Sequence, residues 1–339
     1  MDDLPGLFDN LDMDITDDSL SSQPAVVPPR HVSQAAASRD FNIEPAKLVR
    51  PSSLRFISFG SGSSGNCSYL GIDTGEGRST GILIDAGVDP ETVYQGLRDN
   101  KIDIRNISGI LITHDHGDHV KYAYNIVRNN KHMVIYTTMR TMTGILRRHS
   151  ISRRIKDYHK IIYKEFEFNA GGLAVTAFET SHDGTENVGF AINSPDGTHR
   201  FVMATDMGRI SERADEYMRK ANYIVIESNY DLHKLITGPY PEYLKARIAG
   251  ERGHLDNTVA AKYISSIVEP KLTHVFLCHL SEENNTPDIA FTTMRDALIG
   301  KGLRIGDPSN PLMRDDTDIA LAVLPRQGIS PLFILRHKK

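Results

Sequence analysis

The sequence predicts an α/β fold in which two packed β-sheets carry helices on their outer faces. Short apolar runs rich in β-branched residues recur from Arg55 onward, and helix-like stretches separate several of them. The runs are apolar without interruption, which is typical of strands that are covered on both faces. Each sheet is therefore expected to pack against helices on one face and against a second sheet on the other.

The elements are assigned in chain order from the local pattern. Short runs of Val, Ile, Leu, Phe and Thr indicate strands, because such side chains pack well on a pleated sheet. The strands are expected at residues 55–60, 81–87, 109–114, 133–138, 173–180, 188–192, 200–206, 223–228, 273–280, 319–324 and 332–336. Helices are expected in the longer segments at residues 89–100, 118–130, 139–149, 209–221, 257–268 and 287–302. Because no repeat of fixed period is present, these elements are expected to form one large domain.

The first 50 residues differ from the rest of the chain. They are acidic at first, then rich in Ser, Pro and Ala, and they lack the periodic apolar pattern that offsets the entropy cost of ordering. Residues 1–50 are therefore expected to be a disordered tail, and residues 51–339 to form the folded domain. The alternative for the tail is a short helix that binds a protein partner, because apolar residues lie among its aspartates between Leu4 and Met13.

The overall composition narrows the class of protein. Hydrophobic residues make up 40% and charged residues 24%, as in ordinary globular proteins. The net charge of −4 means that any nucleic acid would have to bind a local basic patch. Two distant cysteines, Cys67 and Cys278, suit reduced core thiols. The chain has no membrane-spanning apolar run, and Asp2 and Asp3 stand where a signal peptide is basic, so the expected location is the cytoplasm.

Residues of the types that bind metal ions stand at the ends of five predicted strands. These residues are Asp85, His114, His182, Asp206 and His279. A strand end is a place where a rigid scaffold presents a side chain to a site. One histidine there would indicate little, but the joint pattern favours a metal centre.

The segment ILITHDHGDHV, residues 110–120, concentrates this pattern. His114 and His116 are two residues apart, so an extended segment can direct both at one point, and Gly117 is expected to permit a close turn. Asp118 and His119 follow as the chain enters a helix, so one loop can supply two neighbouring ions. Imidazole together with carboxylate suits zinc first, then manganese, with iron also compatible. Such an ion lowers the pKa of a bound water to about 7 and so generates hydroxide at neutral pH.

The sequence THDHGDH resembles the His-x-His-x-Asp-His signature of the metallo-β-lactamase superfamily. The resemblance extends from Arg55 to about Arg336 and implies an αββα four-layer sandwich with two divalent metal ions. By this resemblance the first ion would be bound by His114, His116 and His182. The second would be bound by Asp118, His119 and His279. Asp206 would bridge the two ions, and Asp85 would orient a ligand histidine from behind.

Further segments resemble the YycJ-type (WalJ-type) branch, which is related to ribonuclease Z and other phosphodiesterases. They are GSGSSGNCSYL, LIDAGV, ATDMG, IVIESNYD, GHLDN and LCHLSEENN. The resemblance implies 5′ to 3′ exonuclease action on DNA, in which a hydroxide shared by the two ions attacks phosphorus. The chain departs from the branch at Asp256, where serine is usual, and at Tyr230, where histidine is common.

The remaining site residues are interpreted from their chemistry. Asp118 is expected to accept a proton from the attacking water, and His254 to assist the leaving oxygen. Glu227 either accepts a hydrogen bond from a ligand histidine or caps the next segment, and the sequence does not decide between these roles. Ser281 and Asn285 are expected to orient either the His279 loop or the substrate.

Two segments are candidates for contacts with phosphate. The segment GSGSSGN offers Ser63, Ser64 and Asn66, which either bind phosphate or steady the metal loops, or else form a plain hairpin. Arg247 and Arg252 precede His254 and are expected to contact phosphates of the substrate. A second basic cluster at residues 140–160 is interpreted as a solvated helix face.

Two other functions fit the same ligand set. One is a small-molecule hydrolase, such as a glyoxalase II-like thioesterase or a lactonase. The other is a non-hydrolytic metal-binding scaffold or a redox protein, although no flavin-binding domain is visible beside the metal motif. A nuclease would be distinguished by activity on phosphodiesters and by affinity that falls steeply with salt.

Overall fold

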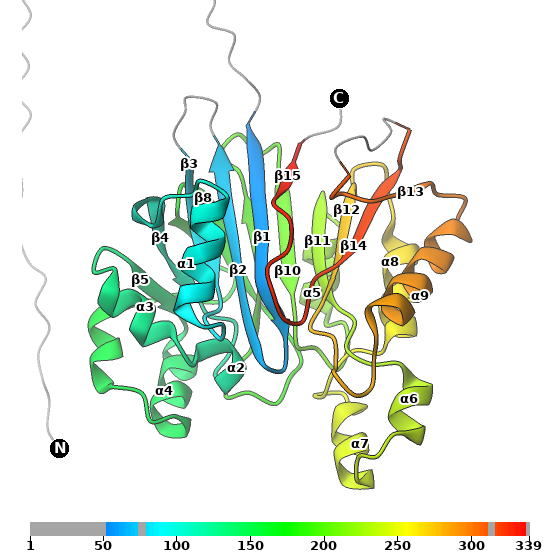
Figure 1. Ribbon diagram of the computed structural model, residues 1–339, viewed down its shortest axis with the longest axis horizontal. Helices are drawn as coiled ribbons and strands as arrows, with labels where there is room; N and C mark the ends of the chain where they lie inside the picture. Colours follow the sequence, from blue (N-terminus) through cyan, green and yellow to red (C-terminus); the bar gives the residue numbers. More distant parts are fainter. Residues whose placement is uncertain (1–51, 74–78, 311–315, 337–339) are drawn as a thin grey trace, which may run out of the picture. The chain divides into compact units, whose positions relative to one another are not determined.

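The structure is a computed structural model that describes residues 52–73, 79–310 and 316–336 (Figure 1). By its internal contacts the chain divides into residues 1–48 and 49–339. The predicted tail and its predicted protein partner therefore lie outside the described residues. No described helix combines the length and the apolarity that crossing a bilayer requires.

The first sheet has seven strands in the order β15-β1-β2-β3-β4-β5-β6. They are β1 (Ser53–Gly62), β2 (Gly65–Asp73), β3 (Ser79–Ile84), β4 (Ile107–Leu111), β5 (Val134–Thr137), β6 (His159–Ile161) and β15 (Phe333–Leu335). Strands β15, β1, β2 and β3 pair antiparallel, and strands β3 to β6 pair parallel. The parallel strands all end at the same edge of the sheet, which is where the metal-ligand motif follows β4.

The second sheet has eight strands in the order β13-β14-β12-β11-β10-β9-β8-β7. They are β7 (Glu167–Ala170), β8 (Leu173–Glu179), β9 (Val188–Asn193), β10 (Arg200–Ala204), β11 (Tyr223–Glu227), β12 (His274–Cys278), β13 (Ile305–Gly306) and β14 (Ile319–Val323). Strands β10, β11, β12 and β14 are parallel neighbours. Their carboxyl ends therefore also share one edge.

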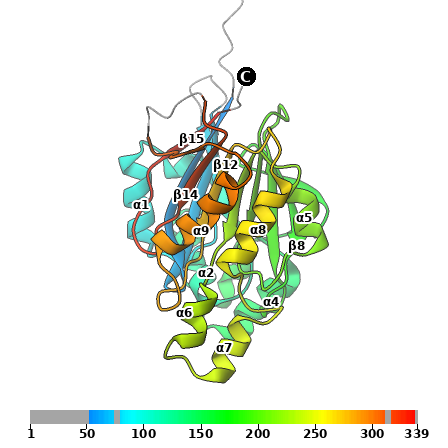
Figure 2. The same ribbon diagram turned by 90° about the vertical axis from the view of Figure 1, so that its right-hand side faces the viewer.

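The two sheets face each other across an apolar core, and helices cover their outer faces (Figures 1 and 2). Between the sheets, the ring of Phe56 in β1 lies 5.2 Å from that of Phe201 in β10 and 5.1 Å from that of Phe276 in β12, measured between centroids. Helices α1, α3 and α4 bury apolar side chains against the first sheet, and α5, α8 and α9 do so against the second. The predicted α/β sandwich is confirmed.

Among the described helices, α1, α4, α5, α6, α8 and α9 begin after a residue whose side chain caps the first turn, whereas α2, α3 and α7 have no such cap. The bounds of these helices are α1 (Pro90–Asp99), α2 (Gly117–Val120), α3 (Ala123–Asn129), α4 (Met139–Arg148), α5 (Glu212–Met218), α6 (Leu232–Thr237), α7 (Glu242–Ile248), α8 (Asn257–Ile267) and α9 (Pro287–Ile299). Two short 3-10 helices span Ile104–Asn106 and Arg153–Tyr158. Asp256 caps α8 by accepting from the backbone N–H groups of Thr258 and Val259, which satisfies donors that have no partner within the helix.

The structure differs from the prediction in several places. Strands β2, β6, β7 and β13 were not among the expected strands. The helix expected at residues 118–130 is broken into α2 and α3, because the N–H of Tyr122 donates to the carbonyl oxygen of Ala86 (2.8 Å) instead of continuing the helix. Helices α6 and α7 were not expected. They are only six and seven residues long, and too short to show a clear apolar period.

The residues that follow three of the strands and point to the site have an unusual backbone conformation. Just after β3, β10 and β12, the residues Asp85, Asp206 and His279 have φ angles of 61°, 54° and 54°. This left-handed region is disfavoured for residues other than glycine and is found most often at functional sites. The turn directs each side chain toward the shared edge of the sheets.

Candidate metal centre

Seven predicted ligand residues converge at the edge where the parallel strands end. Their donor atoms form overlapping groups in which every pair of atoms lies within 4.8 Å. These groups are His114–His116–His182, Asp118–His119–His279, His114–His119–Asp206, and Asp206–Glu227–His254–His279. The first two groups are the two ligand sets that the sequence predicted, and Asp206 belongs to groups that touch both.

We call the converging donor atoms of the seven predicted ligands the cage. Three of the histidines are held by one ring nitrogen, which leaves their other ring nitrogen to face this cage. Nδ1 of His119 lies 2.8 Å from Oδ2 of Asp85, and Nδ1 of His279 lies 2.9 Å from Oε1 of Glu227. Nδ1 of His182 lies 2.8 Å from the carbonyl oxygen of Gly253. Outer partners of this kind fix both the tautomer and the ring orientation of metal-binding histidines.

The other two histidines come from the same loop and face the cage in different ways. Nδ1 of His114 contacts the hydroxyl of Thr113 (3.0 Å), while its buried Nε2 has no hydrogen-bond partner among the described residues. His116 is turned the other way. Its Nε2 lies 3.3 Å from Asp183, and its Nδ1 lies 3.3 Å from Nε2 of His182.

The carboxylate of Asp206 lies between the two sets. Its Oδ2 is 3.4 Å from Nε2 of His119, and its Oδ1 is 3.4 Å from Nδ1 of His279 and 3.8 Å from Nε2 of His182. Oδ2 of Asp118 lies 3.4 Å from Nε2 of His119 and 3.5 Å from Nε2 of His279. These separations lie at or beyond the limit of a direct hydrogen bond and suit donor atoms that share a cation.

The residues present fit divalent metal ions. A buried imidazole nitrogen without a partner costs free energy, and a cation at the Nε2 of His114 would satisfy it. The donor set is imidazole nitrogen with carboxylate oxygen, which zinc, manganese and iron accept. Calcium prefers oxygen ligands alone, so the same donors disfavour it.

The pKa shifts in the site show that a bound cation would replace protons on the histidines. Burial lowers the pKa of His114 well below its usual value. Burial also disfavours charge on His279, but the carboxylates of Asp206, Asp118 and Glu227 raise its pKa to about 10. Burial would raise the pKa of Asp206, yet His279 and His119 lower it well below its usual value. Protons on imidazoles thus balance the carboxylates, and a bound cation would release protons.

Glu227 connects His279 with His254, and so resolves the alternative left open by the sequence. Besides His279, its Oε1 accepts from Nδ1 of His254 (2.7 Å), and its Oε2 accepts from the N–H groups of Met207 (2.8 Å) and Leu255 (3.1 Å). The side chain is fully buried. The pKa of His254 is raised because the Glu227 carboxylate outweighs burial.

The glycine-rich segment forms a hairpin turn and also braces the metal loops. Ser63 and Ser64 occupy the exposed turn between β1 and β2. The side-chain amide nitrogen of Asn66 lies 3.1 Å from Oδ2 of Asp118 and 3.0 Å from Nε2 of His119. The backbone N–H of His279 donates to the hydroxyl of Ser61 (3.0 Å). Asn66 therefore lies at the cage, and the serines of the turn lie outside it.

Ser281 faces a cavity, whereas Asn285 is buried in the protein. Ser281 lines a cavity of about 180 Å³ beside the cage, together with Ser63, Asn229, Arg247 and His254. Asn285 is buried, and its amide nitrogen donates to the carbonyl oxygens of Ser228 and Asn229. The structure thus favours Asn285 as a brace for the loop rather than as a substrate contact.

The two predicted arginines also lie next to the cage. Arg247 donates through Nε to Oδ2 of Asp183 (2.8 Å), the same carboxylate that touches His116. Arg252 donates to the carbonyl oxygen of His182 (3.1 Å). Arg247 lines the cavity beside the cage, and Arg252 lines a second, larger cavity on the other side of His182.

Several residues of the site were missed by the sequence analysis. Asp183 holds His116, and Asn229 donates to the carbonyl oxygen of His279 (2.7 Å). Asp115 is fully buried within the metal-ligand loop and accepts from the N–H (3.0 Å) and the hydroxyl (2.5 Å) of Thr185. Asp115 and Asp183 adjoin predicted ligands, which was the only signal in the sequence.

A glycine near the cage sets a steric limit that can be tested. A Cβ atom on Gly87 would overlap the carbonyl oxygen of Asp118, whereas a Cβ on Gly117 would meet only His149 at 3.6 Å. The turn at position 117 therefore has room for a side chain, and the steric requirement for glycine lies at Gly87. Gly87→Ala is expected to destabilise the fold by about 3 kcal/mol and to weaken metal binding, because overpacking forces the backbone to shift.

The matched variant Gly117→Ala is expected to keep the stability of the fold and the affinity for metal near the wild-type values. Denaturant unfolding and calorimetric zinc titration measure the two effects. Equal behaviour of the two variants would contradict this reading of the turn.

Comparison with known proteins agrees with this geometry. Residues 80–277 match the model of the beta-lactamase superfamily domain. The chain is 30% identical over 255 residues to exodeoxyribonuclease YycJ of Bacillus anthracis, covering 75% of this chain and 92% of the relative. It is 28% identical over 246 residues to exodeoxyribonuclease WalJ of Streptococcus pneumoniae, covering 73% of this chain and 88% of the relative.

The fold is also similar to a solved structure. The metallo-beta-lactamase fold protein YhfI from Bacillus subtilis superposes with a TM-score of 0.54 at 13% identity, over 83% of this chain and 99% of that chain. Together with the His and Asp clusters, this fold implies divalent metal ions. The chain therefore belongs to the beta-lactamase superfamily, as the signature in its sequence predicted.

Proposed function

We propose that this protein is a metal-dependent phosphodiesterase that degrades DNA as an exonuclease, in the 5′ to 3′ direction. The observation that carries the proposal is the convergence of two complete His/Asp ligand sets, with His254 held beside them by Glu227. The relatives named exodeoxyribonucleases, which align over most of their length, support DNA as the substrate.

The ligand assignment is part of the proposal. His114, His116 and His182 would hold one ion, Asp118, His119 and His279 the other, and Asp206 would touch both. Zinc is proposed first and manganese second, since both accept imidazole and carboxylate together. When bound, the ions would supply an activated water and would offset the charge that develops on a phosphoryl group.

The protein's own residues position and protonate the reactants. Nδ1 of His254 is bound to Glu227, so its other ring nitrogen is left to donate a proton to the leaving oxygen. Asp118, whose pKa the neighbouring His119 and His279 lower although burial would raise it, stays ionised and can accept a proton. Glu227 holds His254 and His279 on one carboxylate oxygen and so keeps the proton donor at a fixed position relative to the cage.

The cavity beside the cage is proposed as the place of the scissile nucleotide. Its lining includes His182 and His254, together with Leu244, Arg247 and Ile248 of α7. Arg247 lies within it and would face a phosphate. Ser63 and Ser281 line the same cavity and are proposed as hydrogen-bond partners, and Ser64 is proposed as a weaker contact from the exposed turn.

The location is proposed from the cysteines. Cys67 and Cys278 are both free and buried, as expected of a protein from a reducing compartment. We therefore place the enzyme in the cytoplasm, where DNA is available as a substrate.

A substrate panel with the zinc- or manganese-loaded protein tests the function. Hydrolysis of bis(p-nitrophenyl) phosphate and loss of nucleotides from the 5′ end of labelled duplex DNA are expected, without turnover of thioesters or lactones. DNA affinity is expected to fall linearly with salt on a double-logarithmic plot, with a slope of about −0.7 to −0.9 per phosphate contact. Turnover of thioesters or lactones without phosphodiester cleavage would instead establish the small-molecule hydrolase.

A further inference from the structure

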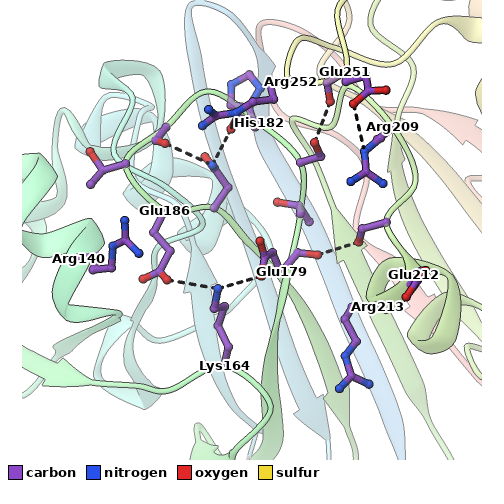
Figure 3. Close-up of a pocket in the computed structure, with 16 residues that line it drawn as sticks. Arg140, Lys164, Glu179, His182, Glu186, Arg209, Glu212, Arg213, Glu251 and Arg252 are labelled. Carbon is purple, nitrogen blue, oxygen red and sulfur yellow. Dashed lines mark hydrogen bonds and ion pairs between the residues drawn. The ribbon is translucent and has the colours of Figure 1, made fainter.

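A second cavity opens on the other side of His182 from the one assigned to the scissile nucleotide. Its volume is about 580 Å³, within the range of ligand sites. The segment between β8 and β9 lines it, with additions from the loop before α5, from residues 251–252 and from the start of α4 (Figure 3). Because His182 lines both cavities, the larger one lies next to the candidate metal centre.

The lining of this cavity excludes most apolar ligands. None of its 16 residues is Leu, Ile, Val, Met, Phe, Tyr or Trp. Small-molecule sites are lined mainly by apolar and aromatic side chains, with a few polar groups for orientation. A ligand that matches this lining must itself be polar and charged along its length.

The guanidinium groups of Arg140 and Arg252 are available to such a ligand, and that of Arg209 is only weakly paired. Within the described part of the chain, no carboxylate lies within 4.0 Å of the cationic groups of Arg140 or Arg252, and Arg209 reaches Glu251 only at 3.9 Å. All three residues are exposed. Figure 3 shows Arg140 and Arg252 at two sides of the cavity, with Arg252 next to His182. Planar guanidinium groups with free N–H donors are well suited to bind phosphate oxygens.

The carboxylates that line the cavity do not cancel these cations. Glu179 and Glu186 share the ammonium group of Lys164, at 3.0 and 3.3 Å. The lining has five cationic side chains against four carboxylates, counting Arg140, Lys164, Arg209, Arg213 and Arg252 against Glu179, Glu186, Glu212 and Glu251. Lys164 offsets one of the two charges on Glu179 and Glu186, and Arg213 is paired with Glu216 (2.7 Å), which lies outside the lining. The cations left for an anion are therefore Arg140 and Arg252 at the margins, with Arg209 only weakly engaged by Glu251.

The positions of Arg140 and Arg252 are fixed by the framework of the site. The hydroxyl of Thr141, next to Arg140, donates to the carbonyl oxygen of Glu186 (3.2 Å) and fastens the start of α4 to the cavity. Arg252 uses Nε to bind the carbonyl oxygen of His182, and so is held one residue away from the cage. Because the side chain of Arg252 is held by this bond, less entropy is lost when Arg252 binds a ligand.

We propose that this cavity binds the backbone phosphates of the DNA strand that continues from the scissile nucleotide, a role that rests on the proposed nuclease function. Arg252 would contact the phosphate nearest the metal centre, and Arg140 and Arg209 would contact phosphates farther along. Contacts of this kind carry no base specificity and set the position of the strand. The basic residue Arg140 thus has a binding role, rather than forming part of a solvated helix face.

Binding without turnover tests this role. Fluorescence anisotropy of labelled single-stranded DNA in EDTA reports affinity without any contribution from catalysis. Arg140→Ala and Arg209→Ala are each expected to raise Kd about fivefold to tenfold at low salt and to lower the salt slope by about one. Arg140→Glu is expected to raise Kd further, because it places a carboxylate beside the strand.

Arg98→Ala is the matched control, because this exposed arginine lies on α1 and does not line the cavity. It is expected to bind DNA with the wild-type affinity. The proposal is overturned when Arg140→Glu and the Arg140→Ala/Arg209→Ala double variant bind DNA as tightly as Arg98→Ala does. Failure of the wild-type enzyme to cleave bis(p-nitrophenyl) phosphate would be a separate result, since it bears on the proposed chemistry and not on the binding of the strand.

Discussion

Asp206→Asn is expected to lose phosphodiester hydrolysis by about 10³-fold or more, because the two proposed ions would lose their shared ligand and with it several kcal/mol of charge stabilisation. Asparagine is the sharper replacement at this position, because it tolerates the φ of 54° better than alanine does. Hydrolysis of bis(p-nitrophenyl) phosphate and the metal content after dialysis measure the loss. His116→Ala is expected to behave in the same way.

The fold should survive both substitutions, since neither side chain belongs to the apolar core. Circular dichroism checks this point, and Asp157→Asn on the surface serves as the control. If Asp206→Asn kept the turnover of the control, the ligand assignment would be refuted.

Glu227→Ala is expected to have the second largest effect, and on two properties at once. The substitution leaves the buried N–H groups of Met207 and Leu255 without an acceptor and removes the partner of two histidines. Unpaired buried donors cost about 1–3 kcal/mol each, so a loss of roughly 2–4 kcal/mol in the free energy of unfolding is expected. Metal affinity is expected to fall by about 10- to 100-fold, as is usual when a partner of a ligand histidine is lost.

Glu227→Gln separates the two effects. Glutamine keeps the shape and one acceptor, so most of the stability should return, while the weaker orientation of His279 should still reduce metal affinity. Urea unfolding measures the free energy of unfolding, and zinc titration by calorimetry measures the metal affinity. Glu269→Ala at an exposed position is the control. Zinc affinity of Glu227→Ala within twofold of the control would contradict the role assigned to this carboxylate.

Local patterns in the sequence were sufficient to predict the two-sheet sandwich, most of its strands and a metal centre at the strand ends, whereas the assignment of individual ligands to two ions came from the family resemblance. The strands are continuous apolar runs, and the residues that follow them are chemically distinct, so β3, β10 and β12 pointed to Asp85, Asp206 and His279. The residues that follow these strands lie close together because strands that are parallel neighbours end at a common edge.

The supporting contacts could not be predicted in this way, because they join residues far apart in the chain. Asp115 binds Thr185 across 70 positions, and Arg247 binds Asp183 across 64. Glu227 was recognised, but its two possible roles could be separated only when His254 and His279 were placed on the same oxygen. Arg252 was predicted to contact phosphate, but the basic cluster that contains Arg140 was interpreted as a solvated helix face, because most basic clusters are solvated surface.

The proposed ligands are divided between the two sheets, and this division sets an order of events during synthesis. His114, His116, Asp118 and His119 follow β4 of the first sheet, whereas His182, Asp206 and His279 follow strands of the second. Neither sheet by itself carries a full coordination set, so an early ion on the nascent chain could be held only loosely. Firm capture of the proposed metal pair must await the emergence of His279 and the docking of one sheet on the other, which makes cofactor loading a late step in the formation of the fold.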